Sequence, residues 1–170
     1  MENSTDPALI VFAWGNESRG DDGIGPLLAR RLLSLGLPAL VVVEDHQLNI
    51  EHITDFVDDT PLLFIDASVS IESGILLEQI EASDDGNFST HAISPRALLN
   101  VYREATGNAP PPAYLLHIAG RSFGLGEGLG NTGSTSAEAA WAFLEKLLRG
   151  PSSEWREALS GGVAQQNHLV

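Results

Sequence analysis

The sequence predicts an α/β fold: a single-domain, three-layer α/β/α sandwich built on a mostly parallel five-stranded sheet with one antiparallel strand. Two patterns and the chain length predict this fold. Short apolar runs typical of buried strands alternate along the chain with runs in which apolar residues recur at helical spacing. A parallel sheet needs this alternation, because helices connect its strands and cover both faces. The length of 170 residues fits one domain, which we expect over residues 1–160, with a disordered tail over residues 161–170.

Five apolar runs predict the strands. In chain order they cover residues 8–14, 39–43, 61–65, 74–80 and 114–119. The third run ends on Asp66, so this carboxylate is expected directly after a buried strand. Because only a short turn separates the third run from the fourth, we expect the fourth strand to be antiparallel.

Runs of helical period between the strands predict the helices, over residues 27–35, 50–57, 94–106 and 134–148. Ser94 and Pro95 supply a cap and a first turn for the third helix. Trp155 and Leu159 indicate a short last helix. The glycine-rich segment 120–133 is expected to be a loop.

The charge of the chain restricts its partners. It carries 23 acidic and 9 basic side chains, a net charge of −14 at pH 7. This charge repels polyanions, so neither nucleic acid nor an anionic membrane is an expected partner.

The absence of cysteine excludes disulfides, thiolate metal sites and cysteine nucleophiles. The first residues lack the basic start of a signal peptide, and no apolar run reaches the roughly 20 residues that span a bilayer. We therefore expect a cytoplasmic protein.

Candidate site residues gather at the expected C-terminal edge of the sheet, where open α/β sheets place their chemistry. Asp21 and Asp22 lie in a glycine-rich turn between the first strand and the first helix, Asp66 follows the third strand, and His91 precedes the third helix. Each has a simpler explanation alone, since an aspartate can cap a helix or end a turn and a loop histidine can be solvated. If they converge, carboxylates and an imidazole form a mixed oxygen and nitrogen set suited to nickel or zinc, with positions open for a substrate group or water.

Two short motifs suggest other functions. Residues 120–124 match the G-x-S-x-G of serine hydrolases, but the glycines that follow prevent the helix that this motif requires. Residues 128–133 match the G-x-G-x-x-G of dinucleotide sites, although no second βαβ half follows. A nucleotide- or ligand-binding α/β domain that uses Gly128–Gly133 is therefore the alternative function. His117, in a predicted strand, is expected to be a hydrogen-bonded, partly buried side chain rather than a ligand.

Three motifs in their order along the chain resemble the hydrogenase maturation endopeptidases, which process the large subunit of nickel–iron hydrogenases at its C-terminus. The family's strand followed by G-N-x-x-x-G-D-[DE]-G-x-G is matched at residues 15–25. Its V-D-A at a strand end is matched by F-I-D-A at residues 64–67, and its S-x-H before a leucine-bearing helix at residues 89–91. The resemblance covers about residues 8–149.

The resemblance implies a protease that recognises a metal. It implies that Asp22, Asp66 and His91 are both the nickel ligands and the catalytic residues, with Asp21 as a supporting or helix-capping carboxylate. The implied activity is that of an endopeptidase that removes the C-terminal extension of a nickel-loaded hydrogenase large-subunit precursor. That precursor is the expected partner and supplies the nickel, and no organic cofactor is expected.

The chemical step has more than one route at this stage. A divalent ion can polarise the scissile carbonyl or lower the pKa of a water, and an aspartate can instead act as general base. The sequence leaves these routes open, as it does the oligomeric state and the identity of the hydrogenase.

Overall fold

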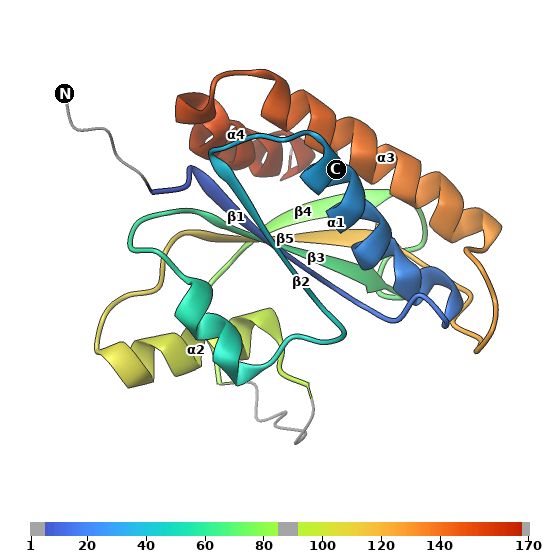
Figure 1. The fold of residues 1–170 in the computed structure, drawn as a ribbon, viewed down its shortest axis with the longest axis horizontal. Coiled ribbons are helices and arrows are strands. Elements are labelled where there is room, and N and C mark those ends of the chain that lie inside the picture. The colour runs from blue at the N-terminus through green and yellow to red at the C-terminus, as the bar shows by residue number, and fades with distance from the viewer. Residues whose placement is uncertain (1–5, 85–91, 168–170) are drawn as a thin grey trace.

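The computed structural model describes residues 6–84 and 92–167, and its five strands form one sheet (Figure 1). The strands are β1 (Leu9–Trp14), β2 (Leu40–Asp45), β3 (Leu62–Ser68), β4 (Ile75–Ile80) and β5 (Ala113–Ala119). Their order across the sheet is β2-β1-β3-β5-β4, in which β4 pairs antiparallel with β5 and the other pairs are parallel. The predicted α/β fold with one antiparallel strand is confirmed.

Helices cover both faces of the sheet. The α-helices of the described ranges are α1 (Ile24–Ser34), α2 (Pro95–Thr106), α3 (Asn131–Arg149) and α4 (Trp155–Asn167). Figure 1 shows α1, α3 and α4 on one face and α2 on the other, which makes the predicted three layers. A 3-10 turn over Ile50–Asp55 replaces the helix predicted at residues 50–57. No helix in the described part of the chain is both long and apolar enough to cross a membrane.

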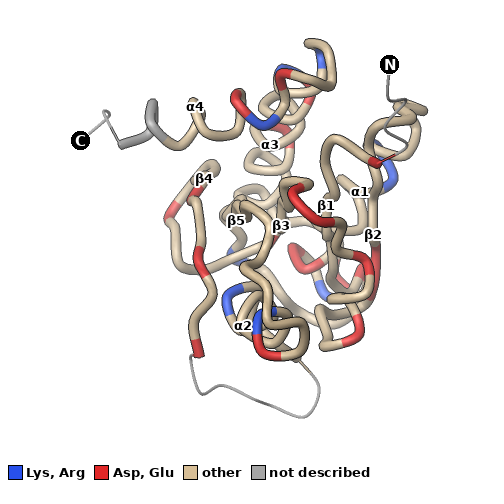
Figure 2. Tube along the Cα trace, turned by 90° about the vertical axis from the view of Figure 1, so that its left-hand side faces the viewer, with Lys and Arg blue, Asp and Glu red and all other residues tan. Residues whose placement is uncertain are grey.

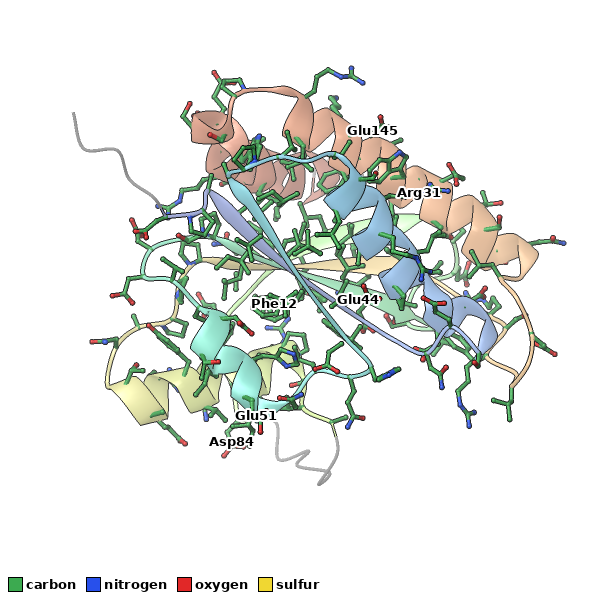
Figure 3. All side chains as sticks on the ribbon, viewed as in Figure 1. Phe12, Arg31, Glu44, Glu51, Asp84 and Glu145 are labelled. Atoms are coloured by element: carbon green, nitrogen blue, oxygen red, sulfur yellow. The ribbon has the colours of Figure 1, made fainter. Side chains whose placement is uncertain are left out.

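Two apolar clusters fill the spaces between the layers. Because side chains alternate between the faces of a strand, neighbouring residues of β3 enter different clusters. Leu63 and Ile65 pack on the side of α1 and α3, whereas Phe64 stacks on Phe12 with ring centroids 5.0 Å apart on the side of α2. Figure 3 shows Phe12 between the sheet and α2. Asp66, two residues beyond Phe64, therefore leaves the sheet on the α2 side.

Two element boundaries near the candidate site differ from those predicted. Strand β3 continues to Ser68, so Asp66 lies within the strand rather than after it, because β3 pairs with β5 over its whole length. Helix α3 begins at Asn131, so Gly133 belongs to the first turn of the helix and not to the loop predicted over residues 120–133. Both differences place backbone that was expected to be irregular into regular structure next to the site.

The C-terminal segment also differs from the prediction of a disordered tail over residues 161–170. Helix α4 continues as far as Asn167, and residues 168–170 lie outside the described residues. The physical reason is packing, since Val163 contacts the apolar cluster on the α1 and α3 side of the sheet. Burial of this side chain favours a further helical turn over a frayed end.

Candidate active site

The turn that follows β1 buries one of its two aspartates completely. Asp21 has an exposed fraction of 0%, and its carboxylate accepts three backbone hydrogen bonds. Oδ2 accepts from the N–H groups of Arg121 and Ser122 at 2.8 and 3.0 Å, and Oδ1 accepts from the Gly130 N–H at 2.8 Å. Burial raises the pKa of this carboxyl, but the three donors outweigh burial and hold the pKa below its usual value. Asp21 is therefore an internal anion that joins the turn after β1 to the glycine-rich loop before α3.

Glycines allow the backbone to approach Asp21 this closely. A side chain at Gly133 would collide with the Asp21 carboxylate, and a side chain at Gly20, whose φ is +58°, would collide with the Ser122 carbonyl. Backbone hydrogen bonds join the same two loops, from the Asp21 N–H to the Ser122 carbonyl at 2.6 Å and from the Gly20 N–H to the Glu127 carbonyl at 3.0 Å. The carboxylate lies at the N-terminal end of α3, where the helix dipole favours negative charge.

This arrangement explains both short motifs of the glycine-rich loop. The segment 120–124 donates its N–H groups to Asp21 and continues as loop instead of entering a helix. The segment 128–133 does begin a helix, but the Asp21 carboxylate already occupies the N-terminal end at which a phosphate group would bind. The structure therefore disfavours both a serine nucleophile elbow and the alternative of nucleotide binding at Gly128–Gly133.

Asp22 is the aspartate of this turn that a ligand can reach, because its side chain is only partly buried. Its Oδ2 accepts a hydrogen bond from the Asn16 N–H at 2.7 Å, which holds the carboxylate beside the end of β1. The other oxygen, Oδ1, has no hydrogen-bond partner among the described residues and can bind a cation or donor from outside the chain.

Asp66 lies on the neighbouring strand β3 and interacts electrostatically with Asp22. Burial is the main cause that raises the Asp66 pKa from 3.8 to about 6; His117 opposes this rise and the Asp22 carboxylate adds to it. Because β1 and β3 are adjacent and parallel, their ends bring the two carboxylates to the same edge of the sheet. A carboxyl with this pKa exchanges its proton close to neutral pH, a property common at active sites.

The third predicted ligand, His91, lies outside the described residues. Within residues 6–84 and 92–167, no group of three His, Cys, Asp or Glu side chains lies close enough to hold a metal ion. Asp22 and Asp66 are thus the part of the predicted set that the structure places at one edge. The complete set of Asp22, Asp66 and His91 stays a prediction.

His117 lies beside Asp66, although its place in a predicted strand indicates only a hydrogen-bonded, partly buried side chain. It is the register partner of Asp66 across β3 and β5, so both side chains leave the same face of the sheet. Its Nε2 lies 2.9 Å from Oε2 of Glu78 on β4, and Glu78 also pairs with Arg96 in the first turn of α2. The expected hydrogen bond is therefore present at Nε2. However, Nδ1 is buried and has no hydrogen-bond partner within the described residues.

A groove with a volume of about 470 Å³ opens beside Asn16, at the ends of β1 and β2. Its lining includes the acidic side chains of Glu17, Glu44 and Asp45, of which Glu17 pairs with Arg30. Figure 2 shows acidic positions around β1 and β2 and basic positions mainly on the helices. Since its lining carries negative charge, the groove is unsuited to a phosphate or a nucleotide.

The fold and this edge define an α/β protein with a carboxylate site at the C-terminal ends of parallel strands. No protein-family model matches the chain, and no curated protein matches it. Several solved structures match the chain. The [NiFe] hydrogenase maturation protease HycI from Thermococcus kodakarensis KOD1 is 23% identical with a TM-score of 0.67, covering 88% of this chain and 96% of that protein.

Two proteins from Escherichia coli have the same fold. The hydrogenase maturating endopeptidase HybD is 20% identical with a TM-score of 0.63, and the match covers 83% of this chain and 91% of HybD. The endopeptidase HycI is 22% identical with a TM-score of 0.61, and the match covers 85% of this chain and 93% of HycI. This chain therefore has the fold of the hydrogenase maturation proteases, which confirms at the level of the fold the resemblance found in the three motifs.

Proposed function

We propose that this protein is an endopeptidase that removes the C-terminal extension of a nickel-loaded hydrogenase large-subunit precursor. One observation carries the proposal: Asp22 and Asp66 meet at the C-terminal edge of the sheet in a fold shared with HycI and HybD. That edge is where open α/β sheets place their reacting groups. The motif order supplies independent support, because the same two aspartates stand at the matching positions of the family's motifs.

In this proposal the nickel belongs to the substrate. Asp22, Asp66 and His91 contact the ion that the precursor carries, so that only a loaded precursor is held for cleavage. Carboxylate oxygen and imidazole nitrogen are suitable donors for nickel. Asp22 is partly exposed and its Oδ1 has no hydrogen-bond partner among the described residues, which fits a ligand that arrives from outside the chain. No organic cofactor is required.

In the cleavage step, these side chains act as proton acceptors and donors near the scissile bond. Asp66 has a pKa of about 6 without a bound ion, so a carboxylate oxygen of Asp66 that does not contact the ion is suited to accept a proton from a water and return it to the leaving amine. A divalent ion next to the bond stabilises the charge that develops on the carbonyl oxygen or on the attacking water. Asp21 contributes indirectly, because its three N–H donors hold the turn that carries Asp22.

The proposal is tested by incubating the purified protein with a nickel-loaded large-subunit precursor and measuring the mass of the precursor's C-terminus. We expect the wild-type protein to release the extension and to leave a nickel-free precursor uncut. His91→Ala and Asp66→Asn should be inactive while retaining the circular dichroism spectrum of the wild type. Ser122→Ala is the matched control and should process normally, because Ser122 contacts Asp21 through its backbone N–H and carbonyl, which the substitution keeps.

The outcomes separate the site assignment from its alternative. Processing by both His91→Ala and Asp66→Asn would remove these residues from the mechanism. Loss of activity in Ser122→Ala with an intact fold would instead favour a serine hydrolase. A protein that cleaves loaded and nickel-free precursor equally well would contradict recognition of the metal.

A further inference from the structure

The unpartnered nitrogen of His117 calls for a physical explanation. A buried nitrogen without a hydrogen bond destabilises the folded state, so native proteins retain few of them and each needs an explanation. His117 Nδ1 is in this state in the described structure, although the other nitrogen of the same ring is bonded to Glu78 at 2.9 Å. The ring is therefore oriented by one partner, and its second nitrogen is buried with no hydrogen-bond partner among the described residues.

In the neutral form of the ring, the contact with Glu78 determines which nitrogen carries the proton. The Glu78 carboxylate only accepts, so the Nε2–H of a neutral ring donates to it and Nδ1 keeps its lone pair. Arg96 also binds Glu78, and although burial raises the Glu78 pKa, the hydrogen bond from His117 and the charge of Arg96 hold it below its usual value. Glu78 is thus a charged acceptor, fixed between β4 and α2.

The position of the ring relates it to the candidate site. His117 is the register partner of Asp66, and both side chains leave the α2 side of the sheet from adjacent parallel strands. A histidine whose second nitrogen donates to a carboxylate is the usual arrangement of a metal-binding imidazole, because the carboxylate fixes the tautomer and makes the free nitrogen more basic. The adjacent Asp66 supplies an oxygen donor on the same face.

We propose that His117 is an additional ligand of this site, in which Nδ1 of His117 binds the cation that Asp66 binds, with Glu78 and Arg96 as the residues that position the ring. The proposal rests on the proposed function only for the identity of the natural ion, nickel. The proposal places a second ligand beside Asp66, the imidazole nitrogen of His117 on β5. The ligands from the described residues do not complete the coordination of the ion, and a loaded precursor brings further ligands of its own.

The test uses NiCl₂ as the probe and the full-length protein. Isothermal titration gives the nickel affinity, and X-ray absorption at the nickel edge gives the number of bound imidazoles. We expect His117→Ala to weaken nickel binding about tenfold or more and to lose one imidazole. Glu78→Gln should weaken binding while keeping the imidazole count. His46→Ala, which removes an exposed histidine at the end of β2, is the control and should change neither quantity.

A second measurement needs no substitution in the site. In wild-type protein with ¹⁵N-labelled histidine, the diamagnetic ion Zn²⁺ should shift the Nδ1 resonance of His117 as expected for a coordinated nitrogen, and leave Nε2 protonated. An unchanged Nδ1 resonance, or a His117→Ala protein that is folded and binds nickel as the wild type does, would overturn the proposal. Neither readout uses cleavage. If His117→Ala weakens nickel binding while the wild-type protein processes no precursor, the proposed function is refuted and the assignment of His117 as a ligand stands.

Discussion

The carboxylate of Asp21 occupies the space into which a side chain at Gly133 would project. The contact joins the turn after β1 to the first turn of α3, and 109 residues separate Asp21 from Gly130, whose N–H donates to the same carboxylate. The backbone of one segment thus packs directly on an internal anion of the other, with no room for a methyl group. Because Asp22 is the next residue, this contact also determines where the candidate site lies.

Gly133→Ala should destabilise the protein by about 2 kcal/mol or more, because the added methyl group must displace the Asp21 carboxylate or the start of α3. The expected destabilisation is opposite in sign to the effect of helix propensity alone, which favours alanine over glycine by about 1 kcal/mol. Gly128→Ala is the matched control, since a Cβ there meets open space. Urea unfolding of both variants measures the difference, and equal midpoints would show that the contact is not tight.

Asp21→Asn should lower the free energy of unfolding by about 1–3 kcal/mol at pH 7, because an amide nitrogen would face a backbone N–H that now has an acceptor. The effect depends on pH in a definite direction. The pKa of Asp21 is lower in the folded protein than its usual 3.8, so its stabilisation is complete above pH 3.8 and is lost as the pH falls through the folded pKa. The difference between wild type and Asp21→Asn should therefore shrink in acid. A difference that stays constant down to the lowest pH at which both proteins fold would contradict this role.

Asp66→Asn should instead raise the free energy of unfolding near neutral pH. The folded pKa of about 6 lies above the unfolded value of 3.8, so the folded protein binds the extra proton and loses stability as the pH rises from about 4 to 6. Asparagine removes this cost, and the variant should gain about 2–3 kcal/mol relative to wild type between pH 4 and pH 7.5 in the presence of a chelator. Thermal melts at the two pH values measure the gain. A variant with the same relative stability at both would mean that Asp66 ionises normally.

Folding should not require a metal. The apolar clusters on the two faces of the sheet form without any metal ligand, and the chain has no thiolate to complete a structural site. The purified protein should melt at the same temperature with and without EDTA, and excess Ni²⁺ should raise the melting temperature by mass action. Elemental analysis accompanies the melts. A tightly held metal whose removal unfolds the protein would identify a structural metal site instead.

Apart from the helix predicted at residues 50–57, which is a 3-10 turn, the local pattern of the sequence was sufficient for the order of strands and helices along the chain. Apolar runs and helical spacing depend on neighbours along the chain, which is why all five strands and the cap of α2 at Ser94 were predicted correctly. Motif order along the chain likewise indicates Asp22, Asp66 and His91 as candidate site residues. Boundaries were less well determined, since the end of β3 depends on its pairing with β5.

Only the tertiary structure decided what surrounds these residues. That Asp21 is internal and Asp22 accessible depends on a loop more than a hundred residues away folding over the first turn. That His117 adjoins Asp66 depends on the order β1-β3-β5, in which strands distant in sequence become neighbours and their register sets which side chains meet. The sequence by itself determined the elements and the residue types at their ends, because these follow from local periodicity. The long-range pairing determined their burial, charge and partners, because those properties belong to contacts that no local pattern contains.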